Sequence, residues 1–227
     1  MMKNLKPDRL LGLAFLLQFV TSFTSGVFLK PIWFVEESIG ETMLNIAANT
    51  GVLHAQHLLD ALTAIGVVFL GAILYAVLRN QDERIALTAF GFYILEAALL
   101  AASILDGYSL LSYSQEFAAA GQPADLLVMG KAAYDSMTFV GGTMHMLVFC
   151  AGAILFYALL DRSRAVPRWM SLWGLITLFP MLAGTLTQFF GYTIPIYFYI
   201  PYVPFELVIG LWILVRGVSV SQNQRAG

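Results

Sequence analysis

Charged residues are scarce in this chain of 227 residues, because Asp, Glu, Lys and Arg together make up only 11% of it. A water-soluble domain carries about 25%. The acidic and basic residues nearly balance, at 14 against 12. This composition excludes a soluble globular fold, a disordered chain and a nucleic-acid-binding protein, since each of these depends on abundant polar or charged surface.

Cysteine is almost absent. The single cysteine, Cys150, lies inside an apolar run, so no disulfide forms within the chain and the redox compartment cannot be inferred. The sequence also has no phosphate-binding glycine loop and no nucleophile motif. We therefore expect no activity driven by ATP bound to this chain.

Apolar residues are what the chain has in abundance: 59% are hydrophobic and the mean hydropathy is +0.77. A membrane-spanning helix needs about 20 predominantly apolar residues. Six stretches of suitable length are bounded by charges, at residues 10–28, 52–78, 85–105, 136–160, 169–190 and 196–215. The sequence predicts an all-α polytopic membrane protein, with residues 1–227 forming a single domain of six transmembrane helices.

The basic residues predict the orientation of this bundle. If the N-terminus is inside, ten of the twelve Lys and Arg lie on the inner side and only Lys30 and Lys131 on the outer side. Positive charge is enriched on the cytoplasmic side of membrane proteins, so both termini are predicted to be cytoplasmic. Acidic residues show the opposite bias, and we expect outer loops to hold Glu36, Glu37, Glu41, Asp106, Glu116, Asp125 and Asp135.

The last stretch is irregular, because three prolines, Pro195, Pro201 and Pro204, interrupt it. A helix from Pro204 to Arg216 would be about 20 Å long, which is shorter than a bilayer core of about 30 Å. The preceding segment is therefore predicted to be kinked or non-helical and packed against protein. An aromatic belt at the outer interface is the expected role of Tyr192, Tyr197, Tyr199 and Tyr202.

Six ionisable residues fall inside the predicted spans, where each costs roughly 2.5–3.5 kcal/mol or more. They are the acids Asp60, Glu96 and Glu206 and the histidines His54, His57 and His145. In the predicted orientation all six lie at mid-depth or in the outer half of the bilayer. We therefore expect a polar intramembrane cavity that opens to the outer face.

This cavity has several possible functions. With Asp60, Glu96 and Glu206 as proton or cation sites, the protein would bind or transport a small solute or a lipid-like molecule. With His54, His57 and His145 as ligands, it would be an intramembrane enzyme that holds zinc, iron or haem. The chain is also consistent with a non-catalytic accessory subunit whose partner is the lipid bilayer.

Structural roles account for some of the same residues. A hydrogen-bonded pair of His57 and Asp60, which lie on neighbouring positions of one helix, would join helices without a metal. His54 is near enough to the interface to be a hydrated polar residue. Glu206 would stabilise the first turn of a helix that begins at Pro204.

Three segments carry a resemblance to a known family. They are FxxLEAALL around Glu96, FYALLDRSRAVPRWMSLWGLI, and PxxPFELVIGLWILVRG around Glu206. Together they resemble a family of small bacterial six-helix membrane proteins catalogued as domain of unknown function four-three-eight-six. The resemblance implies a bacterial cytoplasmic (inner) membrane location and acids at Asp60, Glu96 and Glu206. The three histidines are not part of the family pattern, and Tyr93 stands where members often have Arg.

The SRxVPRW segment is the most specific part of this resemblance. It is rich in arginine, ends at Trp169 and is followed closely by a second tryptophan, Trp173. Such residues mark a membrane–water interface, so we interpret the segment as an inner interface that contacts lipid headgroups weakly.

Overall fold

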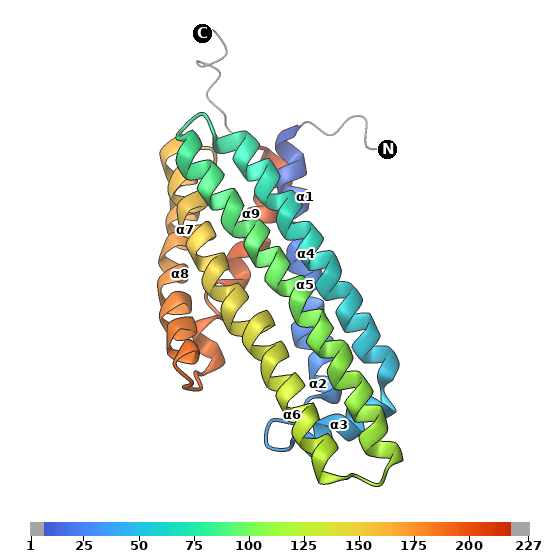
Figure 1. Ribbon diagram of the computed structural model, residues 1–227. Helices are drawn as coiled ribbons and strands as arrows, with labels where there is room; N and C mark the ends of the chain where they lie inside the picture. The colour runs from blue at the N-terminus through green and yellow to red at the C-terminus, as the bar shows by residue number, and fades with distance from the viewer. Residues whose placement is uncertain (1–6, 219–227) are drawn as a thin grey trace. The chain divides into compact units, whose positions relative to one another are not determined.

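A computed structural model describes residues 7–218, apart from the side chains of residues 7, 8 and 196. Every regular element in that range is helical, and none of its residues forms a strand (Figure 1). The helices are α1 (Pro7–Phe23), α2 (Lys30–Trp33), α3 (Ile39–Ala48), α4 (Thr50–Leu78), α5 (Glu83–Ala119), α6 (Ala124–Thr138), α7 (His145–Ser163), α8 (Arg168–Phe189) and α9 (Val203–Arg216). Two π-helical segments, Thr24–Leu29 and Phe139–Met144, join helices end to end, and Ile196–Phe198 is a short 3-10 turn.

Among residues 7–218, five helical segments are long and apolar enough to cross a membrane. They are Arg9–Trp33, Thr50–Leu78, Glu83–Ala119, Ala124–Ser163 and Arg168–Phe189. This finding confirms the prediction of an all-helical chain of the multi-pass membrane type. The last helix, α9, has 14 residues and carries Pro204 in its first turn, as expected for a proline at a helix start.

Two helical segments extend well beyond the predicted spans of residues 85–105 and 136–160. α5 runs for 37 residues to Ala119, and the next helical segment begins at Ala124. Five acids expected in outer loops therefore lie on helices instead: Glu41 on α3, Asp106 and Glu116 on α5, and Asp125 and Asp135 on α6. The predicted spans end where charged residues begin, whereas the backbone hydrogen bonds of a helix continue through polar residues. Between α5 and α6 the chain turns at Gly121 and Gln122, which adopt left-handed conformations before Pro123.

The chain divides into two compact units. Unit 1 comprises Met1–Phe19, Gly66–Glu96 and Met146–Gly227, and unit 2 comprises Val20–Ile65 and Ala97–His145. α8 and α9 belong to unit 1 alone, whereas α3 and α6 belong to unit 2 alone.

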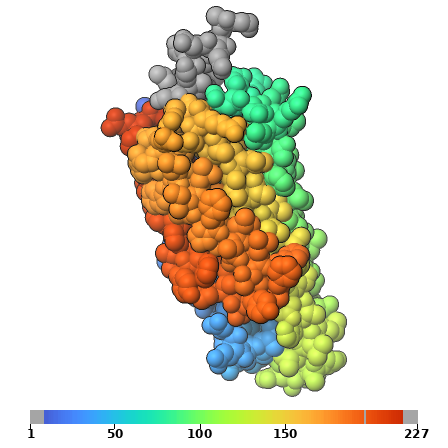
Figure 2. All heavy atoms as spheres, turned by 90° about the vertical axis from the view of Figure 1, so that its left-hand side faces the viewer, coloured from blue at the N-terminus to red at the C-terminus, as the bar shows by residue number. Residues whose placement is uncertain are grey.

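In unit 1, α1 and α9 approach each other very closely. A Cβ atom added to Gly12 would lie 2.7 Å from the backbone oxygen of Gly210 and 2.8 Å from Cα of Leu214. Small residues allow such close backbone contacts between membrane helices. α7 and α8, coloured gold to orange, cover much of the face of this unit that is turned to the viewer in Figure 2.

Unit 2 has its own apolar core, which includes Trp33, Met43, Leu53, Leu110 and Phe117. The short helix α3 enters this core after a capping turn, in which the Ser38 side chain accepts a 3.2 Å hydrogen bond from the backbone N–H of Glu41. This Ser-x-x-Glu sequence is typical of helix starts. Trp33 is fully buried and its Nε1–H donates a 2.7 Å hydrogen bond to Oε1 of Gln56, so α2 is fixed to α4.

Candidate functional site

Glu96 is buried in unit 1, on α5 and inside a candidate membrane span. Its exposed fraction is 3%, and its Oε2 atom has no hydrogen-bond partner among the described residues. A buried polar group without a partner is rare in native proteins, because its desolvation is not compensated. Glu96 is therefore the residue in unit 1 that most requires an explanation.

Glu206 is the second buried acid of this unit, and it lies in the first turn of α9. The Tyr202 hydroxyl donates a 3.2 Å hydrogen bond to its Oε1 atom. Tyr202 in turn shares a 2.6 Å hydrogen bond with the Tyr157 hydroxyl. Glu96 lies within electrostatic range of Glu206, so the two acids form one polar group of residues.

Tyr93 completes this group from α5, one turn before Glu96. It is 1% exposed, and its hydroxyl has no hydrogen-bond partner among the described residues. Its ring packs edge-on against Phe156 at 5.1 Å, and Gly152 leaves the space that the ring occupies, since a Cβ there would lie 2.9 Å from Tyr93 Cδ2. We call Glu96, Glu206, Tyr93, Tyr157 and Tyr202 the acid–tyrosine cluster.

The acid–tyrosine cluster combines two carboxyl groups with three phenol hydroxyls in a buried, apolar setting. Two of its polar atoms, Oε2 of Glu96 and the Tyr93 hydroxyl, are unsatisfied within the described residues. Ionisable groups at bilayer depth are typical of ion pathways, proton relays and ligand sites. The cluster has the chemistry to exchange a proton, to hold a cation or to hydrogen-bond a polar ligand.

Asp60 belongs to unit 2 and has local partners. Ser25 Oγ donates a hydrogen bond to Asp60 Oδ1, and the Lys30 ammonium group lies within electrostatic range of the same carboxyl group. Ser25 lies in the π-helical segment Thr24–Leu29, a type of segment that is frequent at functional sites. Lys30 also lies 5.0 Å from the centroid of the Phe34 ring.

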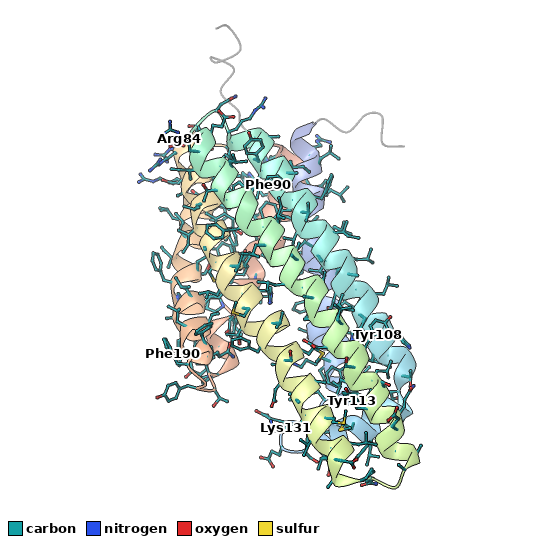
Figure 3. All side chains as sticks on the ribbon, in the orientation of Figure 1. Arg84, Phe90, Tyr108, Tyr113, Lys131 and Phe190 are labelled. Carbon is teal, nitrogen blue, oxygen red and sulfur yellow. The ribbon has the colours of Figure 1, made fainter. Side chains whose placement is uncertain are left out.

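His57 is the most enclosed histidine of unit 2, with 4% of its surface exposed. Its ring lies 5.1 Å from that of Tyr108, a residue labelled in Figure 3, and the exposed His54 ring lies 5.8 Å from the same tyrosine. Neither ring nitrogen of His57 has a hydrogen-bond partner among the described residues. The expected pair of His57 and Asp60 is therefore not formed, and Ser25 takes that role.

His145 is half-buried and begins α7, directly after the π-helical segment Phe139–Met144. Among residues 7–218, no three His, Cys, Asp or Glu side chains are grouped so that they could hold a metal ion. The structure thus brings Glu96 within electrostatic range of Glu206, and it places the rings of His54 and His57 next to that of Tyr108. A zinc, iron or haem site made by His54, His57 and His145 stays a prediction.

The tyrosines of the cluster were not identified from the sequence as site residues. Tyr202 was expected in an aromatic belt, and this is wrong because the side chain is 4% exposed and bonded to Glu206. Tyr192 and Tyr197 are exposed, at 68% and 62%. A signal existed for Tyr202 and for Tyr93, since they precede the acids by four and three residues and so share a helix face with them. Tyr157 had no such signal.

Helices of this length and hydropathy, with acids buried among them, define a multi-pass helical membrane protein. Within that class, the model of the family described as "Domain of unknown function (DUF4386)" matches residues 10–217. The chain therefore belongs to this family. No curated protein and no solved structure matches the chain.

Proposed function

We propose that this protein binds or transports a small solute or a lipid-like molecule in the membrane, and that buried carboxyl groups act as its proton or cation sites. Glu96 is the central residue, Glu206 is its partner, and Asp60 provides a separate acidic position in unit 2. The molecule being handled would interact with Glu96 or with the hydroxyl groups of the acid–tyrosine cluster.

One observation carries this proposal: the Glu96 carboxyl group is 3% exposed and has an oxygen without a hydrogen-bond partner among the described residues. A purely structural acid would be expected to have its hydrogen bonds completed, because an unsatisfied one costs about 1–3 kcal/mol. A site that must bind and release something keeps an acceptor available.

The proposal includes the finer architecture predicted from the sequence. The segment 196–215, with α9 as its regular part, would be the sixth membrane element, and both termini would be cytoplasmic in a bacterial inner membrane. In this arrangement the polar residues would surround a cavity that opens to the outer face.

Reconstituted liposomes test the proposal with defined probes. One set, loaded with a pH-sensitive dye, reports proton movement when a sodium or potassium gradient is imposed. A second set, with fluorescent phosphatidylcholine and a quencher outside, reports lipid movement between leaflets. We expect the wild-type protein to exceed protein-free liposomes in at least one assay, and Glu96→Gln to lose that activity.

The matched control is Glu116→Gln, which neutralises an exposed acid on the same helix, α5, and should leave the activity unchanged. Wild-type protein that equals protein-free liposomes in both assays would refute the proposal, as would full activity of Glu96→Gln. An accessory subunit would show no activity in either assay. Every polar substitution in it would alter only the thermal unfolding temperature.

A further inference from the structure

A groove in unit 1 lies between the turn that joins α7 to α8 and the end of α9. Its volume is about 460 Å³, and its lining includes Arg164, Pro167, Arg168, Trp212 and Arg216. Three of these residues are arginines, and none of the lining residues that the structure describes is acidic. A concave surface with this composition attracts anions.

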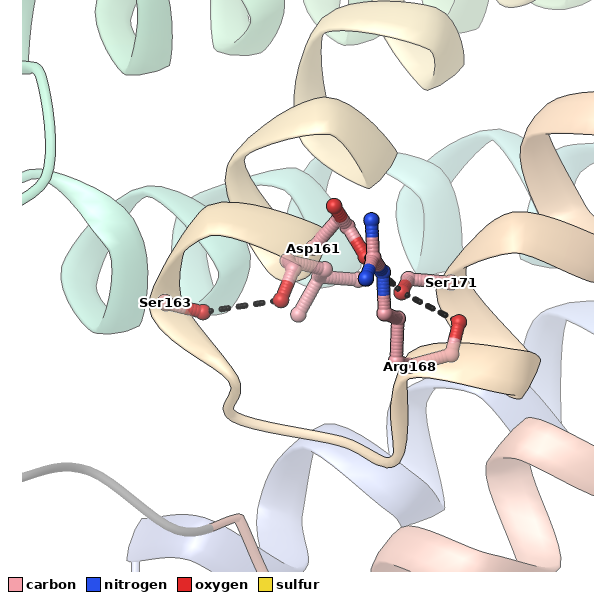
Figure 4. Close-up of polar contacts among 5 residues, drawn as sticks. Asp161, Ser163, Arg168 and Ser171 are labelled. Carbon is pink, nitrogen blue, oxygen red and sulfur yellow. Dashed lines mark hydrogen bonds and ion pairs between the residues drawn. The ribbon is translucent and has the colours of Figure 1, made fainter.

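Two of the three arginines, Arg168 and Arg216, have specific side-chain contacts. Arg168 Nε lies 3.7 Å from Asp161 Oδ1, and Ser171 Oγ donates a 3.0 Å hydrogen bond to the same oxygen (Figure 4). The Arg216 guanidinium lies 5.7 Å from the ring centroid of Trp212. Asp161 offsets much of the charge of Arg168, so Arg164 and Arg216 are the cations available to a ligand.

The backbone supports the same chemistry. Arg164 adopts a left-handed conformation with φ 54° directly after the end of α7 at Ser163, and such a residue ends the helix and turns the chain toward α8. α8 starts at Arg168 after Pro167 and has no side-chain cap, so the first N–H groups of the helix remain available as anion donors. Phosphate groups are bound by this combination of arginine and a helix start.

We propose that this groove binds a phosphate group of an anionic ligand, with Arg164 and Arg216 as its principal contacts. Planar guanidinium groups suit phosphate because they donate two parallel hydrogen bonds to it. The phosphate belongs either to a lipid headgroup or to a soluble compound. Trp169, which stacks on Trp173 at 6.2 Å and contacts Trp212 edge-on at 6.3 Å, places interface-type residues beside the groove.

Binding is measured by native mass spectrometry on the full chain, released from micelles that contain phosphatidylglycerol and phosphatidylcholine. A parallel titration adds glycerol 3-phosphate or inorganic phosphate in solution. The test variant is Arg164→Asn with Arg216→Gln, because asparagine tolerates the left-handed backbone. The control variant, Arg79→Gln with Arg84→Gln, removes the same charge from two exposed arginines of unit 1.

We expect the wild-type and control proteins to retain phosphatidylglycerol in preference to phosphatidylcholine, and the groove variant to bind it at least about tenfold more weakly, given the strength of charge-assisted hydrogen bonds. Tight binding of glycerol 3-phosphate or phosphate would identify a soluble ligand. Binding to the lipid alone would identify a headgroup.

The proposal is overturned if the groove variant binds as well as wild type, if the control variant loses as much, or if wild-type protein shows no preference for either phosphate source. Should the double variant fail to fold, the single Arg216→Gln variant replaces it. A second measurement is then the quenching of Trp212 fluorescence by a bromine-labelled phosphatidylglycerol headgroup, with Trp212→Phe as the control that lacks this signal. Glu96→Gln should bind normally, which separates this site from the proposed transport function.

Discussion

The acids inside the candidate membrane spans have different surroundings in the two units: Asp60 is half-buried, whereas Glu96 and Glu206 are buried. In unit 2, Asp60 accepts a hydrogen bond from Ser25 and has Lys30 near it. In unit 1, Glu96 has an oxygen without a partner among the described residues, although hydroxyl groups and a second acid, Glu206, lie in the same cluster. Asp60 therefore also joins helices through its hydrogen bond, whereas Glu96 keeps an acceptor available to a ligand or a proton.

This difference indicates that hydrogen-bond completion distinguishes an acid that joins helices from an acid with an available acceptor. A carboxyl group whose hydrogen bonds are complete stabilises the arrangement that completes them. One that is deeply buried and incomplete lowers stability, and it is retained where it serves a function. Substitutions that change stability in opposite directions at the two positions test the distinction.

The largest effect is expected at Gly12, where α1 packs against α9, the helix that carries Glu206. In Gly12→Ala, the new Cβ meets backbone atoms of Gly210 and Leu214, which cannot rotate away, so α1 and α9 must separate. We expect a loss of about 3 kcal/mol in the free energy of unfolding, the upper part of the range for overpacking. Denaturation in mixed micelles with increasing dodecyl sulfate measures it, and an unchanged midpoint would contradict the close helix contact.

The corresponding position in unit 2 is Gly107. A Cβ there would meet the His57 ring, with Cε1 2.8 Å away, and a side chain yields more easily than backbone. We expect Gly107→Ala to lower the free energy of unfolding by about 2 kcal/mol. The double variant with His57→Ala should recover most of that loss, and failure to recover it would show that the ring is not the obstacle.

Asp60→Ala comes next in size. Removal of the carboxyl group leaves the Ser25 hydroxyl without its acceptor, which costs about 1.5 kcal/mol for a partly buried hydrogen bond. Thermal unfolding of Asp60→Ala, Ser25→Ala and the double variant measures the coupling between the two side chains. Additive single effects would indicate that the hydrogen bond does not stabilise the protein.

The sequence predicted the helical membrane class and located three acids inside apolar stretches, because long apolar runs and isolated charges are visible without a structure. It did not predict that α5 continues to Ala119, since that extension is polar. Nor did it distinguish Asp60 from Glu96, because hydrogen-bond partners such as Ser25 are distant along the chain. Tyr202 was predictable in principle from its spacing to Glu206, and Tyr157 was not.

The opposite sign is expected for Glu96→Met, which replaces the carboxyl group by an apolar side chain of similar size. Because the group is buried with an unsatisfied oxygen, we expect the free energy of unfolding to rise by about 1 kcal/mol. The same variant should lose the liposome activity proposed above. A marked loss of stability would instead place Glu96 among the acids that hold helices together.

The smallest effect concerns an ion pair on the surface of unit 2. Lys131 Nζ lies 2.6 Å from Asp135 Oδ2, four residues further along α6, and both side chains are more than half exposed. Solvent and salt screen such a pair, so Lys131→Ala should change the free energy of unfolding by less than about 0.5 kcal/mol. Unfolding of both proteins at low and high salt measures this change, and the difference in the free energy of unfolding between wild type and Lys131→Ala should shrink further as salt rises. A loss comparable to that of Asp60→Ala would mean that an exposed ion pair stabilises this protein as much as the part-buried hydrogen bond of Asp60 does. Burial would then not separate structural from surface charges, and the contrast between Asp60 and Glu96 would lose its physical basis.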